Sequence, residues 1–159
     1  DGEAGLLRVK GPNVMSGYLG NTEKTSEVLR DGWYDTGDIV RRDEDGYLWI
    51  EGRLSRFSKI GGEMVPHGTI EETLNELVGE GERLFLITGV PDEKKGEKLV
   101  VLHTASDEVL EEVIEKLNNS SLPNLWKPKA SQFRKVDEIP LLGSGKVDLK
   151  AAQQIAMEA

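Results

Sequence analysis

The sequence predicts an α+β protein: a small β-rich segment over residues 1–51, then a compact domain over residues 52–159 in which helices pack on a small central sheet. Before residue 52, short apolar runs are separated by turn-forming residues, which is typical of hairpins. After it, strand-like runs alternate with stretches of helical periodicity. Hydrophobic residues make up 37% and charged residues 31% of the 159 residues, as in a globular protein.

The β-rich segment contains three apolar runs and one short helical stretch, each bounded by turn residues. The predicted strands lie at residues 6–9, 39–42 and 47–50, and the predicted helix runs from an Asn21 or Thr22 cap to Leu29. The last two strands flank an acidic turn that closes on Gly46, so we expect a β-hairpin there.

The second domain begins with a helix whose apolar residues recur at helical spacing, and Gly79 is placed to end it. The further predicted elements are strands at 84–87 and 99–102 joined through 91–96, a helix capped by Ser106, a strand at 133–136 and a helix from about Asp148. We expect two or three helices on one face of a small sheet. The large aromatic residues are expected to pack in the core or between domains: Trp33, Trp49, Phe57 and Phe85.

Charge and residue types exclude several functions. The net charge of -9 argues against nucleic acid as a partner, because such binding needs a basic surface. Without Cys, the chain has no disulfide, thiol nucleophile or thiolate zinc site, and His67 and His103 share no ligand spacing, so no metal site is predicted. The sequence contains no apolar run of about 20 residues, so no membrane span is predicted.

The string Tyr34-Asp35-Thr36-Gly37-Asp38 is the first of three motifs that carry chemistry. A Gly followed by a carboxylate near a strand can present two acceptor oxygens to a vicinal diol. The alternative is a turn in which Asp38 accepts hydrogen bonds from nearby backbone amides.

The second motif runs from Gly52 to Val65 and contains Lys59 next to a Gly61-Gly62 pair. Two glycines permit close approach of the backbone to a ligand and φ values that other residues avoid. The alternative is a tight bend between strands, with Lys59 in solvent.

The third motif covers residues 140–146 and ends in Gly145-Lys146. A phosphate-binding Walker loop is excluded, because Pro140 stands where its first Gly belongs and Val147 stands where a Ser or Thr would bind magnesium. An ordinary hairpin loop is the remaining alternative to a loop that presents Lys146 to a substrate.

Together and in this order, the three motifs resemble the adenylate-forming superfamily, which includes acyl-CoA and acyl-carrier-protein synthetases, peptide-synthetase adenylation domains and luciferases. The resemblance extends over residues 3–150 and includes the run at 5–18. Residues 56–65 and 140–146 most resemble the bacterial acyl-[acyl-carrier-protein] synthetase / 2-acylglycerophosphoethanolamine acyltransferase group. The resemblance to the superfamily implies that the chain, which begins at Asp1 without Met, is the carboxyl-terminal part of such an enzyme. Residues 1–51 are then the end of its amino-terminal adenylation domain, and residues 52–159 are its lid domain.

The resemblance also assigns roles to residues of this chain. It implies nucleotide binding by Asp38, Arg53 and Tyr34, a pantetheine channel lined by Gly61 and Gly62, catalytic roles for Lys146 in adenylation and Lys59 in thioester formation, and a hinge at Ser55. The hinge position is usually Asp or Lys in the superfamily, so Ser55 is a departure from its pattern.

The implied activity is that of a fatty acid ligase, which forms acyl-AMP from ATP and then an acyl thioester on acyl carrier protein, feeding lysophospholipid acylation. The resemblance implies that ATP with Mg²⁺ is bound mainly by an amino-terminal domain, that the acceptor carries phosphopantetheine, and that this chain alone is inactive. The implied location is the cytoplasm, or the inner face of the bacterial inner membrane for the full-length protein.

Three alternatives stay open. The acceptor can be coenzyme A instead of a carrier protein. The chain can be a docking module for acidic carrier proteins, for which the candidate basic patch is Lys94, Lys95, Lys127, Lys129, Arg134 and Lys135; the alternative is that these are scattered, solvated side chains. It can also be a domain that kept the fold and lost the chemistry, although Asp38, Arg53, Lys59 and Lys146 together argue against that.

Overall fold

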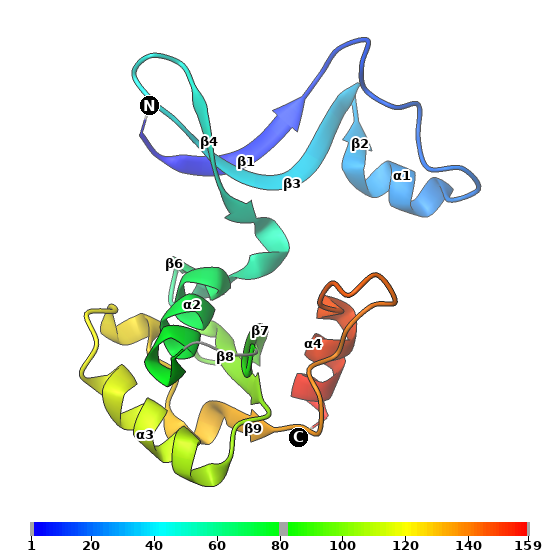
Figure 1. Cartoon of the computed structure of the whole chain (residues 1–159). Coiled ribbons are helices and arrows are strands. Elements are labelled where there is room, and N and C mark those ends of the chain that lie inside the picture. Colours follow the sequence, from blue (N-terminus) through cyan, green and yellow to red (C-terminus); the bar gives the residue numbers. More distant parts are fainter. Residues whose placement is uncertain (1, 80–82, 159) are drawn as a thin grey trace. The chain divides into compact units, whose positions relative to one another are not determined.

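The computed structural model describes residues 2–79 and 83–158. Backbone contacts divide the chain into two compact units, Asp1–Ser55 and Arg56–Ala159. The division falls close to the change of pattern at Gly52-Arg53. The fold is α+β, as predicted, and Figure 1 shows the elements of both units along the chain.

Unit 1 is an antiparallel sheet with one short helix. Its elements are β1 (Ala4–Val9), α1 (Thr22–Val28), β2 (Leu29–Arg30), β3 (Trp33–Arg42) and β4 (Leu48–Arg53). β3 is the central strand and pairs with β1, β2 and β4. The predicted hairpin is confirmed as β3–β4, and its turn is closed by the Asp43 carboxylate, which accepts a hydrogen bond from the backbone N–H of Tyr47 at 2.9 Å.

Strand β3 is longer than the sequence predicts, since it starts at Trp33 and not at Ile39. β1 pairs with it on both sides of the Thr36–Asp38 stretch, at Leu6 opposite Ile39 and at Arg8 opposite Asp35, and the register shifts between these two pairs. The motif therefore lies in the middle strand of a sheet and not in a turn. Gly37 carries the irregularity, with a φ of 76° that favours glycine.

The described residues of unit 2 form a five-stranded sheet and three α-helices. Its elements are η1 (Leu54–Arg56, which starts in unit 1), β5 (Phe57–Ile60), β6 (Glu63–Pro66), α2 (His67–Val78), β7 (Phe85–Asp92), β8 (Gly96–His103), α3 (Asp107–Asn118), η2 (Asn124–Trp126), η3 (Ala130–Gln132), β9 (Phe133–Lys135) and α4 (Leu149–Met157). The strand order is β6-β5-β8-β7, and β9 pairs with β8 in parallel.

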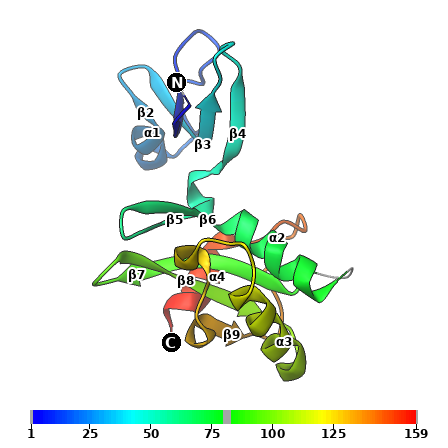
Figure 2. The ribbon, with the colours of Figure 1, turned by 90° about the vertical axis from the view of Figure 1, so that its left-hand side faces the viewer.

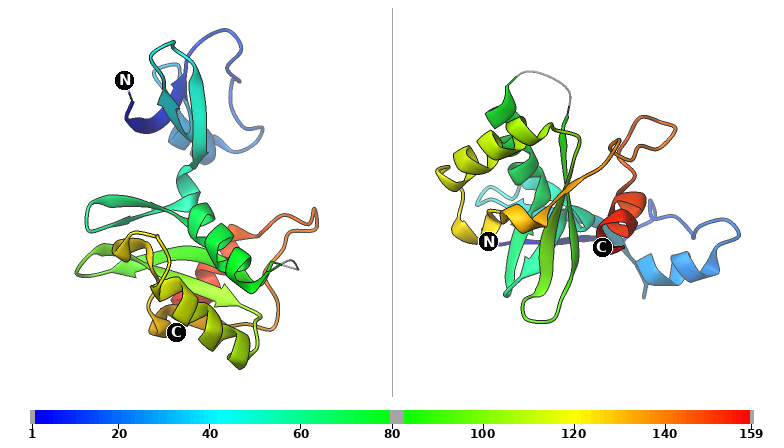
Figure 3. Two further views of the ribbon diagram at one scale, coloured as in Figure 1. Left: turned by 60° about the vertical axis from the view of Figure 1, so that its left-hand side comes forward. Right: turned by 90° about the horizontal axis from the view of Figure 1, so that it is seen from below.

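Helices cover both faces of this sheet, which corrects the prediction of helices on one face. On one face, Phe85, Ile87, Leu99 and Val101 pack in a core with α2 and α3. On the other face, the adjacent residues Leu86 and Leu102 pack against Ala152 and Ala156 of α4. Figure 3 (right) and Figure 2 show α2 and α3 on one side of the strands and α4 on the other. The physical reason is that β7 and β8 are apolar at consecutive positions, so both of their faces need cover.

Helix ends follow the predicted signals. The Ser106 side chain accepts a hydrogen bond from the Val109 N–H, and Asp148 caps α4 in the same way through the Lys150 and Ala151 N–H groups. Gly79 ends α2 with a φ of 103°. In the part of the chain that the structure describes, no helix has the length and apolarity to cross a bilayer.

The aromatic residues divide between core and surface. Phe85 is fully buried, as expected, and Phe57 is partly buried. Trp33 and Trp49 are 41% and 56% exposed, so within the described structure they are not core residues. Trp49 is held by the hairpin turn instead, since its indole N–H donates to the Asp43 carboxylate at 2.7 Å.

Candidate functional site

An aspartate–arginine pair lies across neighbouring strands of unit 1. Asp38 of β3 and Arg53 of β4 are register partners, and the Arg53 Nε lies 2.8 Å from the Asp38 Oδ1. Arg53 also donates to the carbonyl of Thr36 at 3.2 Å, while the Thr36 hydroxyl accepts from the Asp38 N–H at 3.0 Å. The β3–β4 ladder thus fixes a carboxylate and a guanidinium side by side.

Tyr34 lies close to this pair. The Tyr18 hydroxyl beside it raises the pKa of Tyr34, while the charges of Arg53 and Asp38 act on that pKa in opposite directions. The phenol therefore stays protonated at neutral pH and can donate a hydrogen bond. Unit 1 brings together the three predicted nucleotide-binding residues, and the set offers one anionic acceptor, one cation and one neutral donor.

The second motif forms a tight hairpin in unit 2. Lys59 is the third residue of β5, and Gly61 and Gly62 make the turn to β6 with φ values of 60° and 93°. No atom lies within 4 Å of the Cβ that would be built on either glycine, so their backbone is open to solvent. Lys59 is exposed, in agreement with the bend predicted as the alternative, and it can reach a ligand that approaches the turn.

Distant residues brace this hairpin. The Glu97 carboxylate accepts a hydrogen bond from the Lys59 N–H at 2.5 Å, and the Gly61 N–H donates to the carbonyl of Lys95 at 2.9 Å. On the other side of the turn, the Trp126 indole N–H donates to the Glu63 carboxylate at 3.1 Å. The sequence contains no local signal for Glu97 and Trp126, because they act from 38 and 63 residues away.

Lys146 lies on a separate, closed loop of unit 2. Its backbone carbonyl accepts from the Leu142 N–H at 2.7 Å, and the Asp148 N–H donates to the carbonyl of Pro140 at 2.9 Å. Lys146 itself is exposed. Figures 1 and 3 (left) show this loop, residues 140–148, on the opposite side of unit 2 from the β5–β6 hairpin. Unit 2 therefore does not bring its two predicted catalytic lysines together.

A basic cavity lies next to Ile60, at the end of β5. It has a volume of about 960 Å³, and its lining includes six cationic side chains: Lys94, Lys95, Lys98, Lys127, Lys129 and Arg134. All but Lys98 belong to the basic patch expected from the sequence. The sixth member of that patch, Lys135, lies elsewhere and pairs with Asp107 at 2.7 Å.

The cationic side chains of the cavity are not equivalent. Lys127 donates to the carbonyls of Asn118 and Ser120 at 3.0 and 2.9 Å, and Arg134 donates to the carbonyl of Ile155 at 2.7 Å. These two side chains hold the structure around the cavity. The exposed Lys94, Lys95, Lys98 and Lys129 provide its positive charge toward solvent. The arrangement suits an anionic ligand that enters a concave site.

A buried serine–histidine pair in unit 2 is a part of the core and not a nucleophilic dyad. The Ser58 hydroxyl and the His67 Nε2 are 2.9 Å apart, yet Ser58 is fully buried and His67 is 2% exposed. Burial, and secondly the charge of Arg56, lowers the pKa of His67 to about 4. A substrate cannot reach this hydroxyl without opening the sheet.

The described residues offer no cluster of metal-binding side chains. Residues 2–79 and 83–158 contain no group of three or more His, Asp or Glu side chains placed to hold a metal ion. The described side chains therefore form no cage for a divalent cation.

Comparison with known proteins identifies the class. No family model matches the chain. It is 38% identical over 149 residues to feruloyl-CoA synthase of an Amycolatopsis species, covering 92% of this chain and 29% of that protein. It is also 38% identical over 148 residues to the long-chain-fatty-acid–CoA ligase of Bacillus subtilis, covering 91% and 26%. The chain thus spans less than a third of the length of these relatives.

Solved structures agree with this result. ATP-bound MatB from Rhodopseudomonas palustris superimposes with a TM-score of 0.75 at 29% identity, covering 99% of this chain and 31% of that one. The o-succinylbenzoate-CoA synthetase MenE from Bacillus subtilis, in complex with its acyl-adenylate, gives 0.69 at 25% identity over the same shares. Fold and motifs therefore define a carboxyl-terminal portion of an adenylate-forming enzyme.

Within that class, the 38% identity to two acyl-activating enzymes decides the family. The chain belongs to the adenylate-forming acyl- and aryl-CoA ligases.

Proposed function

We propose that the complete protein joins a carboxylic acid to ATP as an acyl-adenylate and then transfers the acyl group to the thiol of coenzyme A. In this proposal, unit 1 supplies the ribose-binding residues and unit 2 is the lid. The main support is that one small unit carries two exposed lysines, Lys59 on strand β5 of the β5–β6 hairpin and Lys146 on the 140–148 loop, and that this hairpin and this loop lie at opposite sides of the unit. One lid can then serve two steps by presenting first one side and then the other.

In the first step, a carboxylate oxygen of the acid attacks the α-phosphorus of ATP, and the bond from that phosphorus to pyrophosphate breaks. Negative charge develops around the phosphorus as the bond forms, and the Lys146 ammonium would stabilise it. Asp38 would accept hydrogen bonds from the ribose hydroxyls, and Arg53 would hold the Asp38 carboxylate in place through their 2.8 Å contact. The Tyr34 hydroxyl would donate a hydrogen bond to the nucleotide.

In the second step, the thiol sulfur attacks the acyl carbonyl carbon of the adenylate and loses its proton to solvent, a thioester forms, and AMP leaves with the bonding electrons. The lid would turn near Ser55 to bring the β5–β6 hairpin to the reaction. The open backbone of Gly61 and Gly62 leaves room for the pantetheine arm, and the Lys59 ammonium would stabilise charge on the departing AMP.

The basic cavity supports coenzyme A as the acceptor. Coenzyme A carries phosphate groups on its nucleotide end and a neutral pantetheine arm. The exposed lysines of the cavity match the phosphates, and Ile60 in its lining places it beside the glycine turn that would receive the arm. A concave site of about 960 Å³ suits a small molecule better than a folded carrier protein, which needs a broad docking surface. Feruloyl-CoA synthase and the long-chain-fatty-acid–CoA ligase, the two relatives at 38% identity, are also named for coenzyme A.

The proposed acid is hydrophobic, aliphatic or aromatic. One of the two relatives is named for a feruloyl group and the other for a long-chain fatty acyl group. These names support a hydrophobic acid as the class of substrate, and no chain length is proposed. A fatty acid is the first substrate to test, in keeping with the resemblance of residues 140–146.

The complete enzyme tests this proposal by steady-state kinetics with coenzyme A and, in parallel, with a holo acyl carrier protein. Replacing Lys98 or Lys129 with Ala should raise the KM for coenzyme A by about threefold to tenfold, because each removes one partly solvated phosphate contact. Lys150→Ala is the matched control, since Lys150 is exposed on α4 and does not line the cavity. Turnover with the carrier protein alone would contradict the proposed acceptor, and an unchanged KM would contradict the proposed site.

A further inference from the structure

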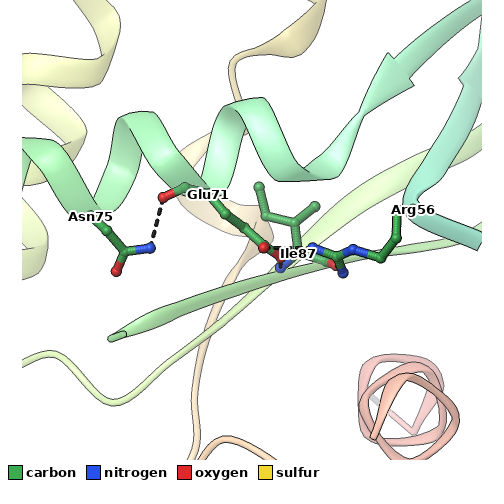
Figure 4. A network of polar contacts seen from close by, with 4 residues as sticks. All are labelled: Arg56, Glu71, Asn75 and Ile87. Carbon is green, nitrogen blue, oxygen red and sulfur yellow. Dashed lines mark hydrogen bonds and ion pairs between the residues drawn. The ribbon is translucent and has the colours of Figure 1, made fainter. Parts of the chain in front are cut away.

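Arg56 is the first residue of unit 2 and follows the predicted hinge residue directly. Its guanidinium lies in a small polar network shown in Figure 4. The Nη2 donates to the Glu71 Oε2 at 2.5 Å, and the Nη1 donates to the backbone carbonyl of Ile87 at 3.2 Å. The Glu71 Oε1 accepts from the Ile87 N–H at 2.6 Å. One ion pair thus satisfies both backbone groups of Ile87.

This contact fixes Arg56 to two elements of the sheet and helix layer. Glu71 lies on α2 and Ile87 lies on β7, whose described pairing is with β8 alone, so Ile87 offers its N–H and carbonyl on the open side of the strand. The side chains of Arg56 and Glu71 are only 21% and 4% exposed. A charged pair at this depth loses its hydration, so it persists only with all its partners in place.

A second contact strengthens the same junction. The Asn75 side chain donates to the Glu71 carbonyl at 2.7 Å and accepts from the Leu84 N–H at 3.1 Å, one turn further along α2. The helix and the strand to which Arg56 is bound are therefore connected to each other. Arg56 is tied to a rigid pair of elements and not to a single side chain.

The chain just before Arg56 is fixed in a different place. Arg53 forms its ion pair with Asp38 within the sheet of unit 1. Between these two arginines lie Leu54 and Ser55, both exposed. Arg53 is therefore attached to unit 1 and Arg56 to unit 2, and only two residues separate these two attachments.

We propose that Arg56, paired with Glu71 and Ile87, is the lid-side anchor of the hinge and confines the reorientation of the lid to Leu54 and Ser55. Arg56 is a positioning residue: it touches no substrate and acts by defining where the chain turns. The expected effect on turnover rests on the proposed two-step function. The expected effect on the motion between the two units does not depend on that function. A pivot confined to two residues turns unit 2 as one body, whereas loss of the anchor adds the start of β5 to the moving segment.

The mechanical consequence can be measured on this chain, because its lack of Cys allows clean spin labelling. One pair of labels joins the units, at Glu44→Cys and Glu111→Cys, and a control pair lies within unit 2, at Glu93→Cys and Glu111→Cys; all three sites are exposed. In Arg56→Ala, the distance distribution between the units should broaden about twofold while the control pair stays unchanged. An unchanged inter-unit width would overturn the proposal. Broadening of both pairs would also overturn it, in favour of a role in core stability.

A milder variant guards against misfolding. Arg56→Lys keeps a positive charge but has one donor group in place of the planar fork, so it can no longer bind Glu71 and Ile87 together. It should broaden the inter-unit distribution in the same direction as Arg56→Ala, to a smaller extent. A width that matches the unsubstituted chain in both variants would show that the guanidinium does not anchor the hinge.

The catalytic consequence is measured on the complete enzyme. Arg56→Lys should lower the overall turnover about tenfold more than it lowers either half-reaction, because switching of the lid and not chemistry is impaired. Val113→Ala, in the core of unit 2, is the control for general destabilisation. Equal losses in overall turnover and in half-reactions would overturn the role in switching. Absence of acyl-adenylate with the unsubstituted enzyme would instead refute the proposed function, and the spin-label result would still decide the anchor.

Discussion

His67 makes the stability of unit 2 depend on pH in a direction that can be worked out. Its ring is 2% exposed, shares a hydrogen bond with the Ser58 hydroxyl through Nε2, and has no partner for Nδ1 among the described residues. A second proton would place a charge there with nothing to receive it. Burial, and next the charge of Arg56, accordingly lowers the pKa of His67 from 6.5 to about 4.

The sign of the effect follows from proton binding. Between about pH 4 and 6.5, the unfolded chain binds a proton at His67 that the folded chain does not, so the free energy of unfolding rises with pH in this window. The contribution is complete above 6.5 and is lost as the pH falls towards about 4. A difference of about 2.5 pKa units corresponds to about 3 kcal/mol in all, of which about 2 kcal/mol is lost by pH 5.

Urea unfolding at about pH 7.5 and pH 5 measures this loss. Trp126 is the single Trp of unit 2, so replacing Trp33 and Trp49 with Phe makes fluorescence report this unit alone. In His67→Gln, the difference between the two pH values should shrink by about 2 kcal/mol. His103, whose pKa is also lowered by burial, is present in both proteins, so its contribution cancels in the comparison. An equal pH dependence in both proteins would refute the buried, neutral state of His67.

Three further predictions concern the sheet, the β5–β6 hairpin that carries Lys59 and the loop that carries Lys146. Lys146→Ala in the complete enzyme should slow adenylation by about 100-fold and leave thioester formation from a supplied acyl-adenylate nearly unchanged, as measured in separate half-reactions; equal losses would contradict the division of roles. Glu97→Ala should do the reverse, slowing thioester formation by about tenfold, because it removes the acceptor for the Lys59 N–H; Glu97→Gln, which keeps an acceptor, is its control. Gly89→Ala should cost about 2–3 kcal/mol in urea unfolding, because the new Cβ would lie 2.1 Å from the Ser58 hydroxyl oxygen; a loss below about 0.5 kcal/mol would show that Ser58 can move aside.

Local signals predicted most of the elements and some of their ends. Ser106 and Asp148 are caps that act within three residues of themselves, so their effect can be recognised from a short window. It was harder to predict which faces of the unit 2 sheet are covered by helices. Consecutive apolar residues such as Leu86 and Ile87 point to opposite faces, and the presence of a cover on each face depends on where a distant helix packs.

The candidate site shows the same limit. The glycine–lysine strings located the β5–β6 hairpin that carries Lys59 and the loop that carries Lys146, because turn chemistry is local. The ion pair between Arg56 and Glu71, the brace from Glu97 and the contact of Trp126 with Glu63 depend on residues 15, 38 and 63 positions apart. Each of these side chains is an ordinary surface type in a sequence, and only the fold makes it a partner.

The attachment of the β5–β6 hairpin has a consequence for local unfolding. Its ladder meets the rest of the sheet at a single register pair, Ile60 opposite Gly96, whereas β7 and β8 pair over eight positions. The buried Ile60 and Val65 hold the two strands in the core, but the Gly61-Gly62 turn lies beyond this pair, and opening the turn alone breaks far fewer bonds than opening the centre of the sheet. The amide protons of the turn should therefore exchange with solvent sooner. The turn that would receive the thiol arm can thus yield to an arriving molecule while the layer beneath it stays closed.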